Sequence, residues 1–218
     1  PGPLTLVLPR KTSQLGELPT IAMRCPDTPW RCAFIETGFQ GHLVMPSANR
    51  SGHISPTTAQ HVADDLGSAV DLIIDAGPCT DGIESTIVKI ETDHSVLLRP
   101  GALPTSALAP YISDLRLPNA DAPIFAPGML KSHYAPKAKV RLDATDKRDG
   151  EAYLAFGPTD IAFDLSLSES GDLSEAAQNL YSALRRLDTV KTIAVAPIPL
   201  QGLGEAINDR LRRAAAER

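Results

Sequence analysis

Short apolar runs of strand length, separated by polar loops, make up the first half of the chain. The runs at 4–8, 20–26, 43–45, 70–75, 85–90 and 96–99 predict strands, and the last two form a pair. Helical patterns over 30–37 and 57–66 lie between them, and a short helix is predicted over 103–111. Strands and helices mixed with hairpins indicate an α/β or α+β sheet, not a simple alternating βαβ array.

The pattern changes after residue 117. Four prolines between 118 and 136 and little periodicity predict an ordered, proline-rich linker over 118–138, which separates a first domain at 1–117 from a second at 139–218. In the second domain, strands are predicted at 140–142, 152–156, 161–165 and 192–196, with a strongly amphipathic helix at 173–187 and a terminal helix at 204–216. This order predicts a small α/β domain with a partly parallel sheet.

Composition and charge are those of an ordinary globular protein. The 218 residues are 43% hydrophobic and carry a net charge of −5 without a basic tract, which argues against a large electrostatic nucleic-acid surface. Cys25, Cys32 and Cys79 show no metal-ligand pairing and fit a reducing, cytoplasmic setting, and no apolar run reaches membrane-spanning length. The chain starts without methionine and enters a strand almost at once, so we expect its first domain to be incomplete at the N-terminus.

The most chemically suggestive stretch is the loop at 46–57, Pro-Ser-Ala-Asn-Arg-Ser-Gly-His-Ile-Ser-Pro-Thr. It runs from a predicted strand into a predicted helix, for which Ser55 or Thr57 supplies the N-cap. This layout gathers backbone N–H groups toward an anion, and the hydroxyl and amide side chains add donors that suit phosphate or carboxylate oxygens. A Ser/Asn-rich surface turn explains the same residues equally well.

Three further polar groups stand at predicted strand ends: Arg24, the Glu-Ser-Thr segment at 84–86, and Arg99 in an Arg-Pro-Gly turn. Two arginines and several hydroxyls, with no Cys–His pair, favour binding of carboxylate and phosphate over protease-type catalysis. Each has an ordinary alternative as a surface, turn or strand residue, and the histidines at 42, 53, 61 and 94 are best explained as surface or hydrogen-bonded residues. The residues alone leave these alternatives open.

Several of these segments, taken together, resemble a known family. They are the stretches at 1–5, 24–26, 46–57, 82–87 and 98–101, followed by 126–129 and 133–136 in the linker and 202–210 near the end. In order and approximate spacing they are similar to the threonylcarbamoyl-AMP synthases of the two-domain type, over nearly the whole chain. The resemblance implies an α/β fold with a YrdC-like domain, built on a twisted mixed sheet, followed by a smaller Rossmann-like α/β domain.

The resemblance also implies an activity. Such enzymes are nucleotidyltransferases that combine L-threonine, bicarbonate and ATP into threonylcarbamoyl-AMP and pyrophosphate, for threonylcarbamoyladenosine formation next to the anticodon of tRNA. By the family pattern, Arg24 and Ser85 hold threonine, with Thr86 nearby. ATP, with Mg²⁺ held largely by its phosphates and water, is bound by Ser47, Asn49, Ser55 and Arg99, and Tyr134 of the linker closes over it as a lid. The reaction is expected to need positioning and charge neutralisation more than a side-chain nucleophile.

The family pattern also has a first portion that precedes Pro1, with a basic segment that contacts ATP and residues that shape the threonine pocket. Without it, we expect the chain as given to make little product. An RNA-binding module of the same fold without catalysis is the alternative, although the acidic balance argues against it. The related hydrogenase-maturation carbamoyltransferases carry cysteine-paired zinc motifs that this sequence lacks. Expected partners are the substrates and, beyond them, tRNA or the downstream threonylcarbamoyl-transferase machinery, with no membrane and no metal-ligand residues.

Overall fold

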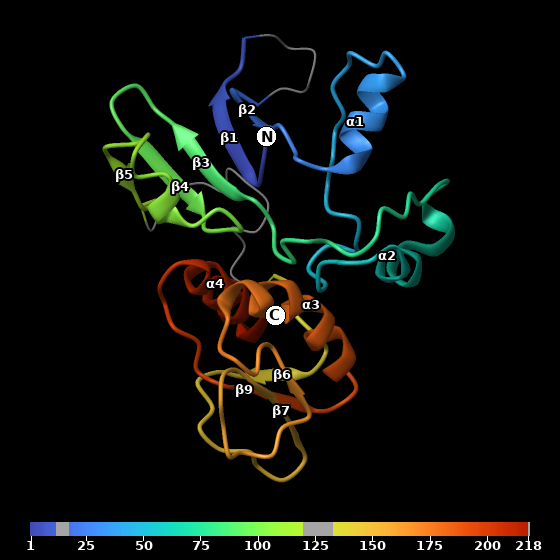
Figure 1. Ribbon diagram of the computed structural model, residues 1–218, viewed down its shortest axis with the longest axis vertical. Helices are drawn as coiled ribbons and strands as arrows, with labels where there is room; N and C mark the ends of the chain where they lie inside the picture. The colour runs from blue at the N-terminus through green and yellow to red at the C-terminus, as the bar shows by residue number, and fades with distance from the viewer. Residues whose placement is uncertain (12–17, 120–132, 218) are drawn as a thin grey trace.

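Two β-sheets lie toward opposite ends of the molecule, with two helices from the second half of the chain between them (Figure 1). The computed structural model describes residues 1–11, 18–119 and 133–217. The predicted linker over 118–138 therefore lies mostly outside the described residues, as does part of the polar loop expected after the first strand. Within the described part, no helix is long and apolar enough to cross a membrane.

The first sheet is mixed. Its strands are β1 (Leu4–Pro9), β2 (Thr20–Arg24), β3 (Thr86–Ile90), β4 (Ser95–Arg99) and β5 (Leu115–Arg116). They lie in the order β2-β1-β3-β4-β5; the pairs β1–β2 and β3–β4 are antiparallel, whereas β1–β3 and β4–β5 are parallel. Because successive side chains point to opposite faces of a strand, Ile87 and Val88 belong to two separate apolar clusters.

Two helices and two short 3₁₀ turns accompany this sheet: α1 (Pro29–Glu36), α2 (Ala59–Leu66), η1 (Gly67–Ala69) and η2 (Thr105–Ala107). The helix expected over 57–66 begins later, and the prediction of Ser55 or Thr57 as its N-cap is wrong, because the hydroxyl of Thr58 accepts the N–H of His61. The helix expected over 103–111 is a single 3₁₀ turn, since Pro110 would lie inside a longer helix, where proline lacks the N–H that must donate to the preceding turn.

Two predicted strands of the first half are wrong. Residues 43–45 and 70–75 form no strand, and most of their apolar side chains are exposed, Val44 at 85% and Leu72 at 76%. An apolar run becomes a strand when a partner strand lies beside it, and within the described ranges neither segment joins the sheet.

The second sheet is fully parallel. β6 (Lys139–Arg141), β7 (Glu151–Ala155), β8 (Leu165–Ser166) and β9 (Thr192–Val195) lie in the order β6-β9-β7-β8. The helices α3 (Leu173–Leu187) and α4 (Leu203–Ala215) complete the predicted strand–helix order, and α3 has the predicted bounds. Asp172 caps α3 by accepting the N–H of Glu175. The predicted fold class is confirmed, with one mixed and one parallel α/β unit.

The strand predicted over 161–165 is wrong except at its last residue. Leu165 and Ser166 pair with β7, but ahead of them the carboxylate of Asp164 accepts the N–H of Tyr153 at 2.7 Å. A side chain therefore takes the place of a strand carbonyl, and the ladder starts later than the apolar pattern suggests.

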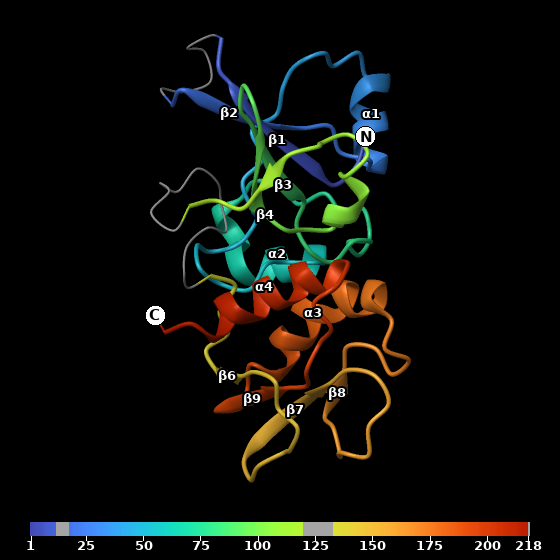
Figure 2. The same cartoon turned by 90° about the vertical axis from the view of Figure 1, so that its left-hand side faces the viewer.

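Helices α3 and α4 form the layer between the two sheets (Figure 2). One side of this layer covers the second sheet, where Leu180, Leu184 and Ile193 are fully buried in one cluster. The other side meets the first half of the chain, where Arg185 of α3 pairs with Asp65 of α2 at 2.6 Å. The two halves are therefore held together by charge as well as by apolar packing.

Gly82 lies against α3 with a left-handed backbone (φ +71°), and a Cβ there would overlap the backbone of Ala177 and Gln178. Gly82→Ala is therefore expected to lower the free energy of unfolding by about 1–2 kcal/mol from the backbone conformation and by about 1–3 kcal/mol more from the overlap. Gly77→Ala is the control, because Gly77 also has a positive φ (+85°) but nothing within 4 Å of an added Cβ. Denaturant unfolding measures both variants, and equal losses would contradict the close contact.

Candidate functional site

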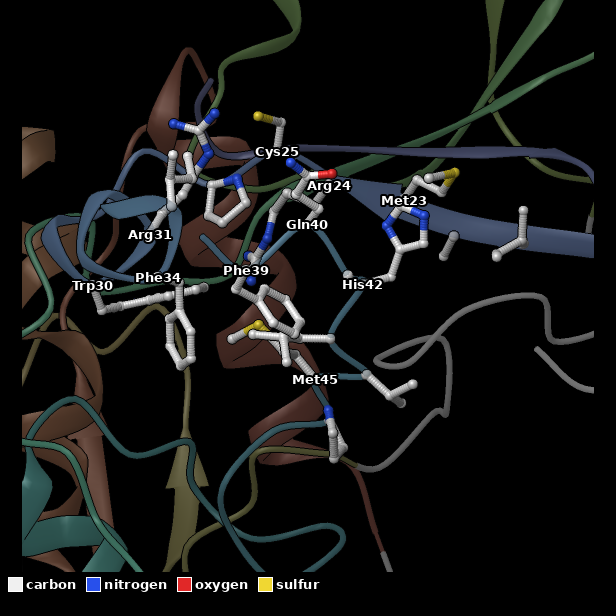
Figure 3. Close-up of a pocket in the computed structure, with 18 residues that line it drawn as sticks. Met23, Arg24, Cys25, Trp30, Arg31, Phe34, Phe39, Gln40, His42 and Met45 are labelled. Atoms are coloured by element: carbon white, nitrogen blue, oxygen red, sulfur yellow. The ribbon is translucent and has the colours of Figure 1, made fainter. Parts of the chain in front are cut away.

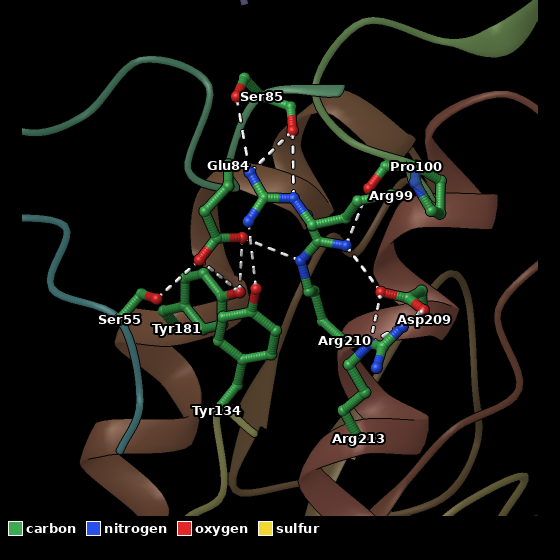
Figure 4. A network of polar contacts seen from close by, with 10 residues as sticks. All are labelled: Ser55, Glu84, Ser85, Arg99, Pro100, Tyr134, Tyr181, Asp209, Arg210 and Arg213. Carbon is green, nitrogen blue, oxygen red and sulfur yellow. Dashed lines mark hydrogen bonds and ion pairs between the residues drawn. The ribbon is translucent and has the colours of Figure 1, made fainter. Parts of the chain in front are cut away.

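Polar side chains from both halves of the chain converge where the first sheet meets α3 and α4 (Figure 4). The structure brings together four of the predicted site residues, which are Ser55, Ser85, Arg99 and Tyr134. Glu84 lies at the centre of the same network, and α3 and α4 add Tyr181 and Arg210. The cluster therefore combines substrate-binding candidates of the first half with groups from the second.

The turn after β4 fixes the geometry of this cluster. Arg99 is the last residue of β4, and the chain then passes so close to the 84–86 segment that a Cβ on Gly101 would overlap the backbone of Glu84 and Ser85. The N–H of Ala102 donates to the carbonyl of Glu84 at 2.9 Å. Glycine permits this approach because it has no side chain, and the approach holds Arg99 beside Ser85.

Arg99 is buried and directs its guanidinium at this turn. Its Nε and Nη2 donate to the carbonyl of Ser85 at 3.2 and 2.9 Å, and its Nη1 donates to the hydroxyl of Tyr134 at 3.4 Å. The hydroxyl of Ser85 lies 3.5 Å from Nη2 and 2.8 Å from the hydroxyl of Thr5. A guanidinium among hydroxyls suits an anionic oxygen of a phosphate or a carboxylate.

Glu84 supplies the negative charge of the cluster. Its carboxylate accepts from the hydroxyl of Ser55 at 2.6 Å, from the hydroxyl of Tyr181 at 2.9 and 3.0 Å, and from Nε of Arg210 at 2.8 Å. Burial by itself raises the pKa of Glu84, but the charges of Arg210 and Arg99 and the hydrogen bonds from Ser55 and Arg210 outweigh it and hold that pKa at about 2. The carboxylate is therefore ionised at neutral pH.

Sequence reasoning gave Glu84 no role of its own and missed Tyr181 and Arg210. Burial raises the pKa of Tyr181 well above its ordinary value, so the phenol stays protonated and donates to the carboxylate. Arg210 shows no exposed surface. A signal was present in the sequence, because Arg210 falls on the apolar side of its helix, with Ile207 and Ala214. Arginine is almost never fully buried unless it is paired, so this position indicates an ion pair with an opposite charge.

The residues predicted to hold threonine, Arg24 and Ser85, lie on neighbouring parts of the sheet. Arg24 ends β2, and its Cα partner in β1 is Thr5, whose hydroxyl contacts that of Ser85. The side chain of Arg24 is exposed and lines a cleft of about 700 Å³ (Figure 3). Apolar side chains make up most of the lining of this cleft, among them Met23, Trp30, Phe34, Phe39 and Met45.

The predicted nucleotide-binding residues of the loop at 46–57 lie in two different environments. Ser55 is buried against Glu84, whereas Ser47 is exposed. Both line a second cleft of about 460 Å³, which Glu84 and Tyr181 also border. Asn49 donates through Nδ2 to two carbonyls of its own loop at 3.1 and 3.0 Å. Its amide therefore shapes the loop that carries the two serines.

Tyr134 is buried with a left-handed backbone (φ +59°), a conformation that tyrosine rarely adopts. Its ring centroid lies 5.3 Å from Cζ of Arg210. Burial raises the pKa of its phenol, so the hydroxyl that meets Arg99 stays protonated. Such a backbone persists where the surroundings over-determine it, and here they hold one aromatic side chain at one place in the cluster.

Comparisons with known proteins agree across the whole chain. A family model described as threonylcarbamoyl-AMP synthase, C-terminal domain, matches residues 105–216, and one described as telomere recombination matches residues 1–101. Threonylcarbamoyl-AMP synthases from Pyrococcus abyssi and Bacillus subtilis are 35% and 34% identical; the alignments cover 100% of this chain and 72% and 71% of those proteins. The crystal structure of P. abyssi Sua5 complexed with L-threonine superposes with a TM-score of 0.84 at 33% identity, covering 99% of this chain and 71% of that one.

The depressed pKa of Glu84 predicts a stability change in acid. The stability that its ionised form contributes is fully present above its ordinary pKa of 4.5 and is lost as the pH falls toward about 2, an effect on the order of 3 kcal/mol. Denaturant unfolding across this range should show that the difference in the free energy of unfolding between wild type and Glu84→Gln becomes smaller as the pH falls. Glu36→Gln, which alters an exposed carboxylate of α1, is measured alongside as the control. Parallel curves for Glu84→Gln would show that its carboxylate is not stabilised by folding.

Proposed function

The chain belongs to the threonylcarbamoyl-AMP synthase family, and from that membership we propose that it forms threonylcarbamoyl-AMP and pyrophosphate from L-threonine, bicarbonate and ATP. In this proposal it is a cytoplasmic nucleotidyltransferase. Its product serves threonylcarbamoyladenosine formation next to the anticodon of tRNA, through downstream transferase machinery. The proposed division of labour is substrate binding by residues 1–117, a lid over 118–138 and a second domain over 139–218.

The observation that carries the proposal is the placement of Arg99. Its buried guanidinium stands at the end of β4, between the Ser85 segment and the hydroxyl of Tyr134. Both neighbours belong to segments whose residues match the family pattern. A fixed guanidinium with hydroxyl groups beside it is suited to the oxygens of a polyphosphate.

The product explains why such a group is needed. Threonylcarbamoyl-AMP is a mixed anhydride in which a carbamate oxygen is joined to the phosphorus of AMP. The amine of threonine and bicarbonate combine to a carbamate with loss of water, and a carbamate oxygen then displaces pyrophosphate from the α-phosphorus of ATP. Negative charge grows on the departing pyrophosphate, so a preorganised cation stabilises the transition state. The protein contributes positioning and charge neutralisation, and no side-chain nucleophile takes part.

We assign the substrates to the two sides of this cluster. Ser85 and Arg24 hold threonine. Thr5 of β1 supports this pairing, because it is the strand partner of Arg24 and its hydroxyl contacts that of Ser85. ATP is bound by Arg99 and Tyr134 together with Ser47, Asn49 and Ser55 of the loop at 46–57, which borders the 460 Å³ cleft. Mg²⁺ arrives with the phosphates of ATP; the described part of the chain groups no three His, Cys, Asp or Glu side chains as a metal site.

The proposed reaction is tested by measuring pyrophosphate release with all substrates and with each one left out. In a protein that carries the upstream portion of the family pattern, release is expected to require L-threonine and bicarbonate as well as ATP and Mg²⁺, and mass spectrometry should detect threonylcarbamoyl-AMP in the complete mixture; the chain as given is expected to make little of it. Release that does not depend on threonine would contradict the proposal. Salt-sensitive RNA binding with no pyrophosphate release would favour a binding module instead.

Arg99→Ala is expected to weaken ATP binding by about 1.5–3 kcal/mol, or roughly 10- to 150-fold, because a charge-assisted hydrogen bond to phosphate is lost. Calorimetric titration with MgATP measures the change. Arg116→Ala is the matched control, since Arg116 is an exposed arginine of β5 that pairs with Asp114 at 2.5 Å. An unchanged affinity in Arg99→Ala would remove this residue from the nucleotide site.

A further inference from the structure

Two guanidinium groups, one from each half of the chain, act on the largely buried carboxylate of Glu84 (Figure 4). Arg210 of α4 donates through Nε to Glu84 at 2.8 Å. Arg99 of β4 directs Nε and Nη2 to the carbonyl of Ser85 and Nη1 to Tyr134. The second domain therefore supplies a cation to the carboxylate, while the guanidinium of the first domain is held on the Ser85 side.

These two arginines compete for the same charge. The charges of Arg210 and Arg99 both favour the ionised form of Glu84, which burial opposes. A largely buried ion is strongly destabilised when its partner is removed. If Arg210 were lost, Glu84 would draw the guanidinium of Arg99 toward itself and away from Ser85.

We propose that Arg210 is a positioning residue: by pairing with Glu84 it keeps the guanidinium of Arg99 beside Ser85 and Tyr134, where it meets the substrates. The inference rests on the proposed function for the role of Arg99. It gives the second domain a part in the reaction that Arg210 performs through Arg99 and not by touching substrate itself.

Arg210 is built as a fixed counter-ion. Its side chain is completely buried, in contrast to the 21% exposure of the Glu84 side chain. Nη1 donates at 2.8 Å both to the carbonyl of Pro100 and to the carboxylate of Asp209. Because Pro100 directly follows Arg99, the guanidinium of Arg210 binds both the carboxylate of Glu84 and the turn that carries Arg99. A surface ion pair has no such restraint and contributes little.

The test uses three variants of the whole protein. Arg210→Met removes the charge and keeps an apolar stem, and Glu84→Gln/Arg210→Met removes both partners. Arg213→Met is the control, because Arg213 lies on the same helix and bonds Asp209 but not Glu84. The position of Arg99 is followed by the NMR signal of its Nε–H group, which Arg99→Lys identifies, and kcat and KM are measured for threonine and ATP.

In Arg210→Met the Arg99 signal is expected to shift and kcat/KM to fall at least about tenfold, as when one member of a buried charge pair is truncated. In Glu84→Gln/Arg210→Met the signal should return and kcat/KM should recover to within a few-fold of wild type, and Arg213→Met should match wild type. If Arg210→Met does not fold, the double variant and Arg210→Lys, which keeps the charge, decide the question by the same two measurements.

An unmoved Arg99 signal in Arg210→Met would overturn the inference, whatever the activity. So would a double variant that is as impaired as Arg210→Met, because the cost would then come from lost packing. A wild-type protein that carries the upstream portion of the family pattern and still makes no threonylcarbamoyl-AMP would overturn the proposed function, and the NMR signal would still decide whether Arg210 controls the position of Arg99.

Discussion

A single buried carboxylate constrains the whole junction between the two sheets. Removing an ion from water costs several kcal/mol after relaxation, so Glu84 is tolerated there because a serine, a tyrosine and an arginine donate to it. Those donors lie on three separate segments, the loop at 46–57, α3 and α4. The need to satisfy one charge therefore fixes where these segments stand relative to the strands that carry Ser85 and Arg99.

The distribution of roles across the chain follows from this arrangement. The groups suited to substrate oxygens come from the first half and from Tyr134 of the linker, whereas the guanidinium that balances the charge of Glu84 comes from the second half. Side chains of the parallel sheet pack with those of α3 and α4 in one apolar cluster, and this packing holds the helices in place. Fixed helices matter because an electrostatic site gains its effect from groups that do not reorganise during the reaction.

Sequence patterns correctly predicted the elements whose bounds are marked by local features of the sequence. The helix α3 has capping, an apolar stripe and a clear end, and its predicted bounds are those observed. The segments at 43–45 and 70–75 failed because an apolar run does not reveal whether a partner strand lies beside it. For the candidate site, family motifs pointed to Ser55, Ser85, Arg99 and Tyr134, which the structure brings together. Arg210 also lies in a stretch that resembles the family, but its partner could not be predicted, because the contact with Glu84 spans 126 positions.

The ion pair between Glu84 and Arg210 limits which changes of sequence the protein tolerates. The two members lie on units that each have their own sheet, and such units are commonly exchanged between genes during evolution. Exchange of either unit alone would place a carboxylate or a guanidinium, without its counterpart, in a dry contact. In chains that carry both units, the carboxylate and the guanidinium are therefore expected to be kept or lost together, and the boundary between the sheets is not a point where sequences from distant relatives can be joined freely.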